Sequence, residues 1–502
     1  MNYYIGIDLG TSSCKGILTD PSGAIIREYS EDYNVSYPVP GWSEQDPADW
    51  LKAAKTILKK LGSGLENDVR GVAIAGQMHG LVMLDGDDNV IRPAILWNDG
   101  RSDAETAYLN SLPDLTEMTG NIAFAGFTAP KILWVKKNEP GNFARARKIC
   151  LPKDYVAYKL TGVFSTEPSD AAGMLLMDVK KRCWSERMCA LCGITSAMLP
   201  EIYESWEVTG RLDPSLGFPN AFMCAGAGDN AAAAVGTGTI SEGDCSISLG
   251  TSGTVFLPVS GAENLPGGDN SSGGETASGG ETASVSTAGN SGGVLHLFAH
   301  ASGGLHLMGC ILSAASCNKW WTKEILETGY DLFSDEKAGE NRVWFLPYLT
   351  GERCPHNDVN ARGAFIGLSA DTTKDDMSLA VFEGVAYALR DCIEAGGVSV
   401  RKAVLSGGGA GSEMWRRILA GVLGADLYMS ETAQGPSFGA AILAMTGMGE
   451  YASVAEAAGR IVKKKLVTAC EPALREKYDR GYGIYRQLYP ALRDIFARMN
   501  GR

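Results

Sequence analysis

The sequence predicts an α/β protein whose two large domains carry the same fold. Two segments, Ile5–Ser13 and Cys245–Thr254, share one pattern about half a chain apart. In each, an apolar run typical of a strand breaks at Gly-Thr-Ser and is followed by a second apolar run. A chain of 502 residues also exceeds what one hydrophobic core usually serves. We therefore expect a duplicated fold with one such turn at the head of each half.

The two turns, Gly10-Thr11-Ser12 and Gly250-Thr251-Ser252, have the chemistry of a phosphate site. A glycine at the tip lets the backbone come close to a ligand. Hydroxyls and exposed backbone N–H groups are suited to phosphate oxygens. One such turn would be an ordinary hairpin, but two of them predict a clamp on a phosphate chain.

The first half begins with a predicted three-stranded meander. Its strands are expected at Tyr3–Leu9, Lys15–Thr19 and Ala24–Tyr29. The run Asp49–Leu61 then has the apolar spacing of a helix, with Trp50, Leu58 and other apolar residues on one face. Buried strands are expected at Val72–Ala75 and Val82–Leu84.

The second half repeats this plan. Strands around the second turn are followed by predicted helices at Lys374–Ala395 and Ser412–Leu423, with the strand Ala403–Leu405 between them. We place the boundary near Ile240–Gly243, which gives domains of residues 1–241 and 242–502. Residues 260–293 are rich in Gly, Ser, Thr, Ala and Glu and contain a direct repeat. Such a segment cannot offset its ordering entropy by burial, so we expect an insertion without fixed structure, and a lid role stays open.

Charge and composition exclude several classes of function. The formal net charge of -13 disfavours nucleic acid or an anionic membrane as a partner. No run approaches the ~18–20 apolar residues of a membrane span, and no basic segment precedes the first strand as in a signal peptide. The 12 cysteines are scattered, and the one Cys-x-x-Cys motif, Cys189–Cys192, has no second pair beside it. We expect a reduced, cytoplasmic protein.

A carboxylate stands where a predicted strand meets a predicted helix. Asp229 follows the apolar run Phe222–Ala225 and precedes the strong helix former Ala231–Ala234. It could cap the helix by accepting backbone N–H bonds. It could also be a general base that points into a cleft, and the glycines Gly226 and Gly228 favour this second interpretation because they let a substrate approach.

Two further polar clusters follow predicted strands. Gln77-Met78-His79-Gly80 comes after Val72–Ala75, and Trp97-Asn98-Asp99-Gly100-Arg101 ends another apolar run. Loops after buried strands are where α/β proteins bind small ligands, and these groups suit a polyhydroxylated one. The alternatives are a structural histidine and a capping turn with a surface salt bridge.

Common nucleotide motifs are absent from the sequence. It has no Gly-x-x-x-x-Gly-Lys-Ser/Thr loop and no protein-kinase motif set, and Gly407-Gly408-Gly409 does not have the spacing of a dinucleotide fingerprint. If the protein handles ATP, it does so through the paired hairpins.

The chain resembles the FGGY family of carbohydrate kinases, in its xylulokinase branch, over nearly its whole length. Gly126–Asn138 matches the first family signature, and Gly363–Leu368 through Asp376 to Glu383 matches the second. The branch is indicated by segments that include Met78 and His79, where glycerol kinases carry Arg-Glu-Thr. The other branch segments are Trp97–Arg101, Pro152–Tyr155 and Gly228–Asn230.

This resemblance implies a two-domain ribonuclease H-like fold, shared with actin and hexokinase, with the active site in the cleft between domains. It implies phosphorylation of D-xylulose by MgATP, with Asp229 as general base. Met78 and His79 would contact the ketose, Asn230 and Asp99 are weaker substrate candidates, and Asp8 would act near Mg²⁺ and the phosphates. Both Gly-Thr-Ser turns would face the phosphate chain, with Gly408 and Gly409 beside the adenosine. The segment with His296, His300 and His306 would be a hairpin, and a homodimer is common among such relatives.

Two departures and three alternatives stay open. The insertion at 260–293 is longer than the usual family connection, and Gly421 stands where relatives often have aspartate, which would affect nucleotide affinity or helix packing. The substrate could be another ketopentose or polyol, such as ribulose or L-xylulose. The chain could instead be a non-catalytic sugar or nucleotide sensor, although it lacks a basic helix-turn-helix extension. An actin-like assembly or chaperone protein would bind ATP without a sugar-facing Met-His loop.

Overall fold

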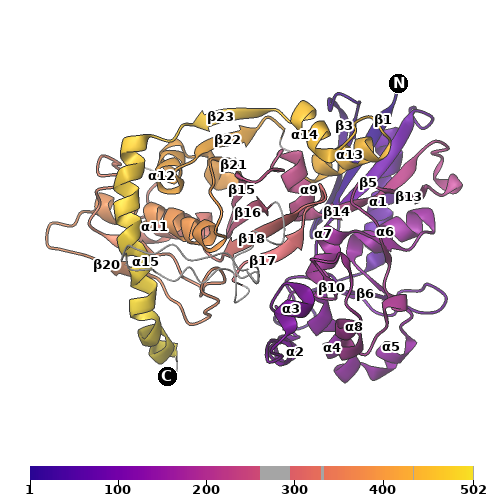
Figure 1. The fold of residues 1–502 in the computed structure, drawn as a ribbon, viewed down its shortest axis with the longest axis horizontal. Coiled ribbons are helices and arrows are strands. Elements are labelled where there is room, and N and C mark those ends of the chain that lie inside the picture. Colours follow the sequence, from indigo (N-terminus) through magenta and orange to yellow (C-terminus); the bar gives the residue numbers. More distant parts are fainter. Residues whose placement is uncertain (260–293, 330–332, 433–434, 501–502) are drawn as a thin grey trace, which may run out of the picture. The chain divides into compact units, whose positions relative to one another are not determined.

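The computed structural model describes residues 1–259, 294–329, 333–432 and 435–500, and the chain forms two compact units (Figure 1). The first unit comprises Met1–Ile240, Leu297–Leu305 and Thr432–Lys463. The second comprises Ser241–His296, His306–Glu431 and Lys464–Arg502. The predicted insertion at 260–293 lies outside the described residues. None of the helices in the described ranges combines the length and the apolar character needed to cross a membrane.

The first unit is built on a mixed sheet that contains the predicted meander. Its strands, in spatial order, are β13 (Val208–Arg211), β14 (Phe222–Gly228), β5 (Val69–Gly76), β1 (Tyr3–Leu9), β2 (Ser13–Thr19) and β3 (Ile25–Asp32). The meander β1–β2–β3 is antiparallel, whereas β1, β5 and β14 run parallel. The parallel set matters for function because it brings three strand ends to one edge.

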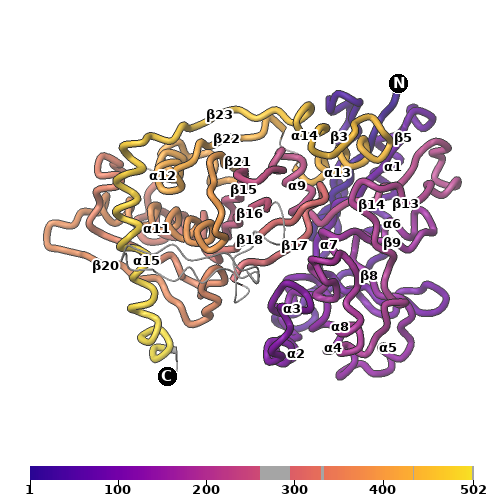
Figure 2. Tube along the Cα trace, viewed as in Figure 1, coloured from indigo at the N-terminus to yellow at the C-terminus, as the bar shows by residue number. Residues whose placement is uncertain are grey.

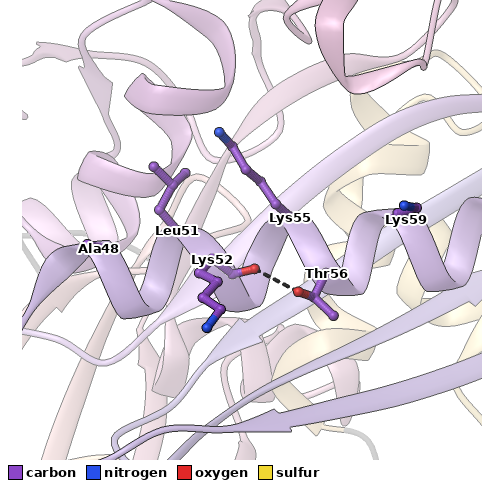
Figure 3. A pocket seen from close by; sticks show the side chains of 6 residues that line it. All are labelled: Ala48, Leu51, Lys52, Lys55, Thr56 and Lys59. Atoms are coloured by element: carbon purple, nitrogen blue, oxygen red, sulfur yellow. Dashed lines mark hydrogen bonds between the residues drawn. The ribbon is translucent and has the colours of Figure 1, made fainter.

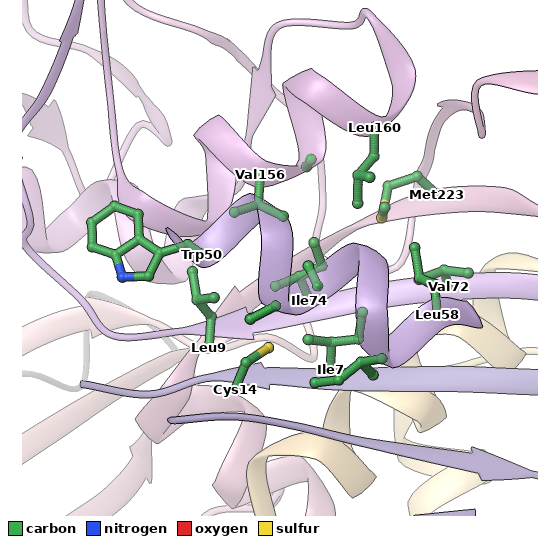
Figure 4. Packing of buried hydrophobic residues seen from close by; sticks show 14 of the residues in the cluster. Ile7, Leu9, Cys14, Trp50, Leu58, Val72, Ile74, Val156, Leu160 and Met223 are labelled. Atoms are coloured by element: carbon green, nitrogen blue, oxygen red, sulfur yellow. The ribbon is translucent and has the colours of Figure 1, made fainter. Parts of the chain in front are cut away.

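One face of this sheet is covered by α1 (Pro47–Gly62) and α6 (Pro152–Thr161). The carboxylate of Asp46 caps α1 by accepting the N–H of Ala48 at 2.9 Å, and the helix has proline at its first position. Its apolar stripe, which includes the fully buried Trp50, packs on Ile7 and Ile74 of the sheet and on Val156 of α6 (Figure 4). The predicted helix is confirmed.

The other face is covered by α13 (Gly435–Gly447), which belongs to the late segment Thr432–Lys463 of this unit. Figure 2 shows this late segment beside the earliest strands, and it packs on β1, β5 and α9 (Asp229–Gly236). Glycines permit the close approach. A Cβ on Gly6 would lie 1.9 Å from the carbonyl oxygen of Ser437, and one on Gly439 would lie 1.8 Å from that of Ala232.

Shorter elements complete the first unit. Its further helices are α2 (Asp103–Asn110), α3 (Leu115–Thr119), α4 (Thr128–Asn138), α5 (Pro140–Arg145), α7 (Pro168–Ala171), α8 (Glu186–Cys192) and α14 (Val454–Ile461). Its short strands include β4 (Glu44–Gln45), β6 (Val82–Leu84), β7 (Ala94–Ile95), β8 (Lys148–Cys150), β9 (Ser165–Thr166), β10 (Met177–Asp178), β11 (Cys183–Trp184) and β12 (Glu201–Ile202).

The second unit is also built on a mixed sheet that contains an antiparallel strand pair beside parallel strands. Its neighbouring strands are β18 (Leu305–Ile311), β16 (Gly253–Val259), β15 (Asp244–Leu249), β21 (Lys402–Ser406), β22 (Asp426–Ser430) and β23 (Lys464–Thr468). The second predicted meander begins with the antiparallel pair β15–β16, and β15 runs parallel to β21. Further elements are α10 (Ala315–Lys319), η5 (Trp320–Ile325), β19 (Trp344–Leu346), β20 (Ala364–Ile366) and η6 (Gly408–Gly411).

Helices α11 (Lys374–Ala395), α12 (Glu413–Leu423) and α15 (Pro472–Asn500) pack together in the second unit. The bounds of α11 are those predicted. Its start is set by a reciprocal capping box between Thr373 and Asp376. Gly421 lies in α12 against α15, where an added Cβ would lie 2.7 Å from the Tyr478 ring and 3.0 Å from Leu474. Helix packing is therefore the physical reason for glycine at this position.

The histidine-bearing segment has the predicted strand-turn-strand form. Strand β17 (His296–Ala299) precedes β18, and a turn closed by the N–H of His300 on the carbonyl of Gly304, at 2.8 Å, joins them.

Candidate active site

Three parallel strands of the first unit end side by side. β1 ends at Leu9, β5 at Gly76 and β14 at Gly228. In register, Asp8 pairs with Ala75 on one side of β5, and Ala227 pairs with Ala75 on the other. The Gly10-Thr11-Ser12 turn, the Gln77–His79 loop and Asp229 therefore leave the sheet at one edge, where open α/β sheets bind ligands.

Asp229 is the first residue of α9, and the N-cap position belongs to Gly228. Asp229 is therefore not the N-cap residue, although its carboxylate does accept a backbone N–H at the start of the helix. Its Oδ1 accepts the N–H of Asn230 at 2.7 Å. The chain enters this position through Gly226 at φ 82°, where an added Cβ would lie 2.1 Å from the carbonyl oxygen of Ile74. Glycine is required there, so the bend that sets the direction of Asp229 is built into the sequence.

Two carboxylates face the same environment at this edge. Burial raises the pKa of Asp229 to about 7, and the negative charge of Asp8 adds to the effect. Burial also raises the pKa of Asp8 to about 6, opposed by the positive charge of Lys15. A carboxylate whose pKa lies near the working pH suits a general base. Two neighbouring carboxylates are also the oxygen ligands that Mg²⁺ prefers.

The loop after β5 is held in an uncommon backbone conformation. His79 has φ 69°, a left-handed value for a residue other than glycine. Its carbonyl oxygen accepts hydrogen bonds from Thr128 Oγ1 at 3.0 Å and from Lys131 Nζ at 2.9 Å. Lys131 is fully buried, and burial lowers its pKa to about 7. Sequence reasoning missed Lys131, although it lies inside the first signature segment.

The two side chains of the same loop have different neighbours. His79 Nδ1 lies 2.9 Å from the carbonyl oxygen of Gly173, so Nδ1 carries the proton in this contact. The buried Met78 Sδ lies 3.9 Å from Asn230 Nδ2. The structure thus brings Met78 to Asn230, and both Met78 and His79 lie against Gly173. Their contact with a ketose stays a prediction.

Asp99 makes its contacts within the protein. One oxygen accepts the N–H of Ser43 at 2.5 Å and Arg101 Nη2 at 2.7 Å, and the other accepts Arg101 Nε at 2.8 Å. Both side chains of this ion pair are fully buried, and the guanidinium lies 3.7 Å from the ring centroid of Trp42. The salt bridge of the alternative interpretation is therefore present, but it is buried and does not lie on the surface. A contact between Asp99 and a sugar stays a prediction.

A pocket of about 710 Å³ lies in the second unit beside the second Gly-Thr-Ser turn. Of the five residues predicted there, Gly250, Thr251, Gly408 and Gly409 line it, and Ser252 does not. The pocket is also lined by Leu249, Ala315, Ser316, Lys319, Trp320, Lys323 and Glu324. Apart from Leu249, which ends β15, these residues belong to α10 and η5, and sequence reasoning missed them because those two elements carry no recognisable motif.

A second hollow, of about 410 Å³, lies on α1 (Figure 3). It is lined by one helix only, through Leu51, Lys52, Lys55, Thr56 and other residues of α1. Thr56 Oγ1 donates to the Lys52 carbonyl at 3.0 Å within the helix. The hollow has no carboxylate and no glycine turn, so it is not the candidate active site.

Comparison with known families matches both halves of the chain. Residues 3–236 match the N-terminal domain, and residues 245–448 the C-terminal domain, of the FGGY family of carbohydrate kinases. The chain is 41% identical over 471 residues to the xylulose kinase of Escherichia coli (strain K12), which covers 90% of this chain and 92% of that protein.

Solved structures agree with this assignment. The crystal structure of a xyloylose kinase from Brucella ovis is 35% identical with a TM-score of 0.85, and covers 98% of this chain and 100% of that one. A xylulose kinase from Rhodospirillum rubrum is 26% identical with a TM-score of 0.86, and covers 99% and 100%. The predicted two-domain actin- and hexokinase-like fold and the ATP-dependent carbohydrate kinase activity are confirmed. The chain belongs to the FGGY family of carbohydrate kinases.

Proposed function

We propose that this kinase phosphorylates D-xylulose with ATP to give D-xylulose 5-phosphate, with Asp229 as the general base. The observation that carries the proposal is the assembly of Asp229, Asn230, Met78 and His79 at one sheet edge. These residues belong to the segments that distinguish the xylulokinase branch. The xylulose kinases among the relatives support the same substrate.

In the proposed reaction, Asp229 accepts the proton of the terminal sugar hydroxyl while that oxygen attacks the γ-phosphorus of ATP. The bond between the γ-phosphorus and the bridging oxygen breaks, and ADP leaves in line with the attack. A sugar hydroxyl is a poor nucleophile, and a positioned base typically contributes ~10²–10⁴-fold. The proton passes from Asp229 to solvent when the products leave.

We further propose that Met78 and His79 position the ketose, with Asn230 and Asp99 as weaker candidates. His79 suits this role because its carbonyl has two donors and its ring Nδ1 is held on Gly173. A side chain held in one rotamer loses little entropy when it binds a ligand.

The nucleotide is proposed to use the pocket of the second unit. Gly408 and Gly409 would lie beside the adenosine, with Gly250, Thr251 and Ser252 toward the phosphates. A Cβ on Gly408 would meet nothing within 4 Å, whereas one on Gly409 would lie 2.4 Å from the Trp415 ring. Open space above Gly408 lets a ligand approach the backbone there. The turn Gly10-Thr11-Ser12 is proposed as the second phosphate contact.

Asp8 is proposed as the protein ligand of Mg²⁺. Asp8 and Asp229 stand at the ends of strands on either side of β5, and two carboxylates at one sheet edge are a donor set that fits a hard divalent cation. When bound with the nucleotide, Mg²⁺ neutralises charge on the phosphate oxygens.

The substrate is tested by ADP production across a panel of ketoses, aldoses and glycerol. We expect the largest kcat/KM with D-xylulose. A larger value with ribulose, L-xylulose or a polyol would replace D-xylulose as the substrate, and no stimulation by any sugar would favour a sensor or assembly protein.

We propose a cytoplasmic location. All 12 cysteines are free thiols, and free thiols persist in reducing compartments. A homodimer stays a prediction.

A further inference from the structure

We propose that Gln45, Gln77 and Trp97 are positioning residues that connect the first phosphate turn, Gly10-Thr11-Ser12, to the ketose loop, Gln77–His79. Through this connection, ketose and nucleotide bind cooperatively. The side chain of Thr11, at the tip of the turn, makes the hydrogen bonds that connect the turn to Gln77 and Trp97. This inference rests on the proposed function, because that function assigns the turn to phosphate and the loop to the sugar.

The hydroxyl of Thr11 has a defined direction. It lies 3.3 Å from Gln77 Oε1, and an amide oxygen only accepts, so Thr11 is the donor. Trp97 Nε1 donates to the same hydroxyl at 3.0 Å. The single hydroxyl proton of Thr11 is thus used inside the protein. Thr11 therefore orients the turn with its side chain and leaves its backbone to face a phosphate.

The two glutamines continue this directed network. Gln77 Nε2 donates to Gln45 Oε1 at 3.0 Å and to the Gly10 carbonyl at 3.4 Å. Gln45 Nε2 donates to the Thr11 carbonyl at 2.7 Å and to that of Asn34 at 3.1 Å. Both glutamine side chains are buried, so each of these bonds stands in a low-dielectric environment, where an unpaired polar group is costly.

The amide orientations are mutually consistent. Trp50 Nε1 also donates to Gln45 Oε1, at 3.1 Å. The amide oxygen of Gln45 therefore accepts two hydrogen bonds, from Trp50 and Gln77, and its amide nitrogen donates two. Reversing Gln77 would place its oxygen against Gln45 Oε1 and the Gly10 carbonyl, so one arrangement is selected. A network of this kind has one low-energy geometry.

The same residues connect the turn and the loop through the backbone. The N–H of Gln77 donates to the carbonyl of Leu9 at 2.8 Å, and Leu9 immediately precedes the turn. Gln77 is also followed directly by Met78 and His79. A shift of the ketose loop that moved Gln77 would therefore break bonds to Gly10 and Thr11. Because the loop and the turn share these bonds, a ligand that restrains one also restrains the other, which is the physical basis of the proposed cooperativity.

The test measures the dissociation constant of MgADP with and without saturating D-xylulose. In the wild type we expect D-xylulose to tighten MgADP binding. Trp97→Phe removes the N–H donor but keeps an aromatic ring, and Trp97 is 46% exposed, so the fold should tolerate the change. We expect it to reduce the tightening about three- to tenfold, the range for losing one hydrogen bond of ~1 kcal/mol. The matched control is Trp184→Phe, which removes a bond from Trp184 Nε1 to the Pro200 carbonyl at 2.9 Å.

Variants of Thr11 add a second readout. Thr11→Ser keeps the hydroxyl and should keep the cooperativity, whereas Thr11→Val should lose it. Because Thr11→Val and Trp97→Phe break the same hydrogen bond, the double variant should be no worse than Thr11→Val alone. A Thr11 that served only as a phosphate ligand would instead give additive effects, and Trp97→Phe would leave MgADP binding unchanged.

The outcomes separate the two proposals. A wild type that neither binds nor phosphorylates D-xylulose overturns the proposed function and this inference together. A wild type that phosphorylates D-xylulose but binds MgADP independently of it overturns this inference alone. The same holds if Trp97→Phe and Trp184→Phe behave alike.

Discussion

Asp229→Asn is the substitution that most directly perturbs the proposed chemistry. Asparagine keeps the size of the side chain and can still accept the N–H of Asn230, which lies 2.7 Å from Asp229 Oδ1. It cannot accept the proton of a sugar hydroxyl. We therefore expect kcat to fall ~10²–10⁴-fold, with the dissociation constant for D-xylulose changed little.

The pH dependence of kcat/KM in the wild type is a second, independent expectation from the role of Asp229 as general base. The pKa of Asp229 is raised to about 7 by burial and by the charge of Asp8, so the protonated, inactive form persists to neutral pH. A group with this pKa is ionised to about one-tenth at pH 6, half at pH 7 and nine-tenths at pH 8. Since the base works only when ionised, kcat/KM should rise about tenfold from pH 6 to pH 8.

The assay is ADP release coupled to a chromogenic reaction, with sugar binding measured separately by calorimetry. Asp103→Asn is the matched control, because Asp103 is also the first residue of a helix but is exposed in α2. Turnover by Asp229→Asn within a few-fold of the wild type would refute the assignment of the base, and a flat profile from pH 6 to pH 8 would refute the raised pKa of Asp229.

Three further perturbations have defined outcomes. His79→Ala should raise the KM for the ketose more than the KM for ATP in steady-state assays, and equal effects would indicate a structural histidine. Gly408→Ala should weaken nucleotide binding with little loss of stability, whereas Gly409→Ala should lower the melting temperature because its Cβ would meet the Trp415 ring at 2.4 Å; the reverse order would contradict the pocket. Burial raises the pKa of Glu352 to about 8, above the unfolded value, so its contribution is present at low pH and is lost as the pH rises through 8. The melting temperature of Glu352→Gln, measured against the wild type, should therefore improve from pH 5 to pH 9, and a constant difference would count against this pKa.

Local patterns in the sequence are enough to predict the elements whose ends carry their own signals. β1 has the predicted bounds Tyr3–Leu9, because an apolar run ends there at a glycine turn. α11 also has the predicted bounds, since its capping box is local. The position of Asp229 after a buried strand follows from the same kind of signal.

The partners of these elements depend on contacts that no local pattern reveals. α13 packs on β1 and β5 although hundreds of residues separate them, and its surface is apolar nearly all round. Such a helix must be buried, but its sequence does not say against which strands. The small residues that allow the contact, such as Gly6, are meaningful only once both surfaces are known.

The candidate site likewise contains some residues that local sequence patterns predict and others whose contacts no local pattern reveals. Met78, His79 and Asp229 could be predicted because each stands just after a strand. The buried environment of Asp99 could not be predicted, because Ser43, which supplies an N–H, is 56 residues away. The contacts of Lys131 with His79 and of Gln45 with Gln77 were missed for the same reason, since these partners lie 52 and 32 residues away and long polar side chains are usually exposed.

The position of the phosphate on the product shows directly which sugar hydroxyl is phosphorylated. Purified protein is incubated with MgATP and D-xylulose, and the sugar phosphate is examined by phosphorus–proton correlation NMR. From the proposed function, we expect sugar-dependent ADP release and a single product with phosphate on the terminal C5 hydroxyl. Phosphate on another hydroxyl, or ADP release that D-xylulose does not stimulate, would contradict it.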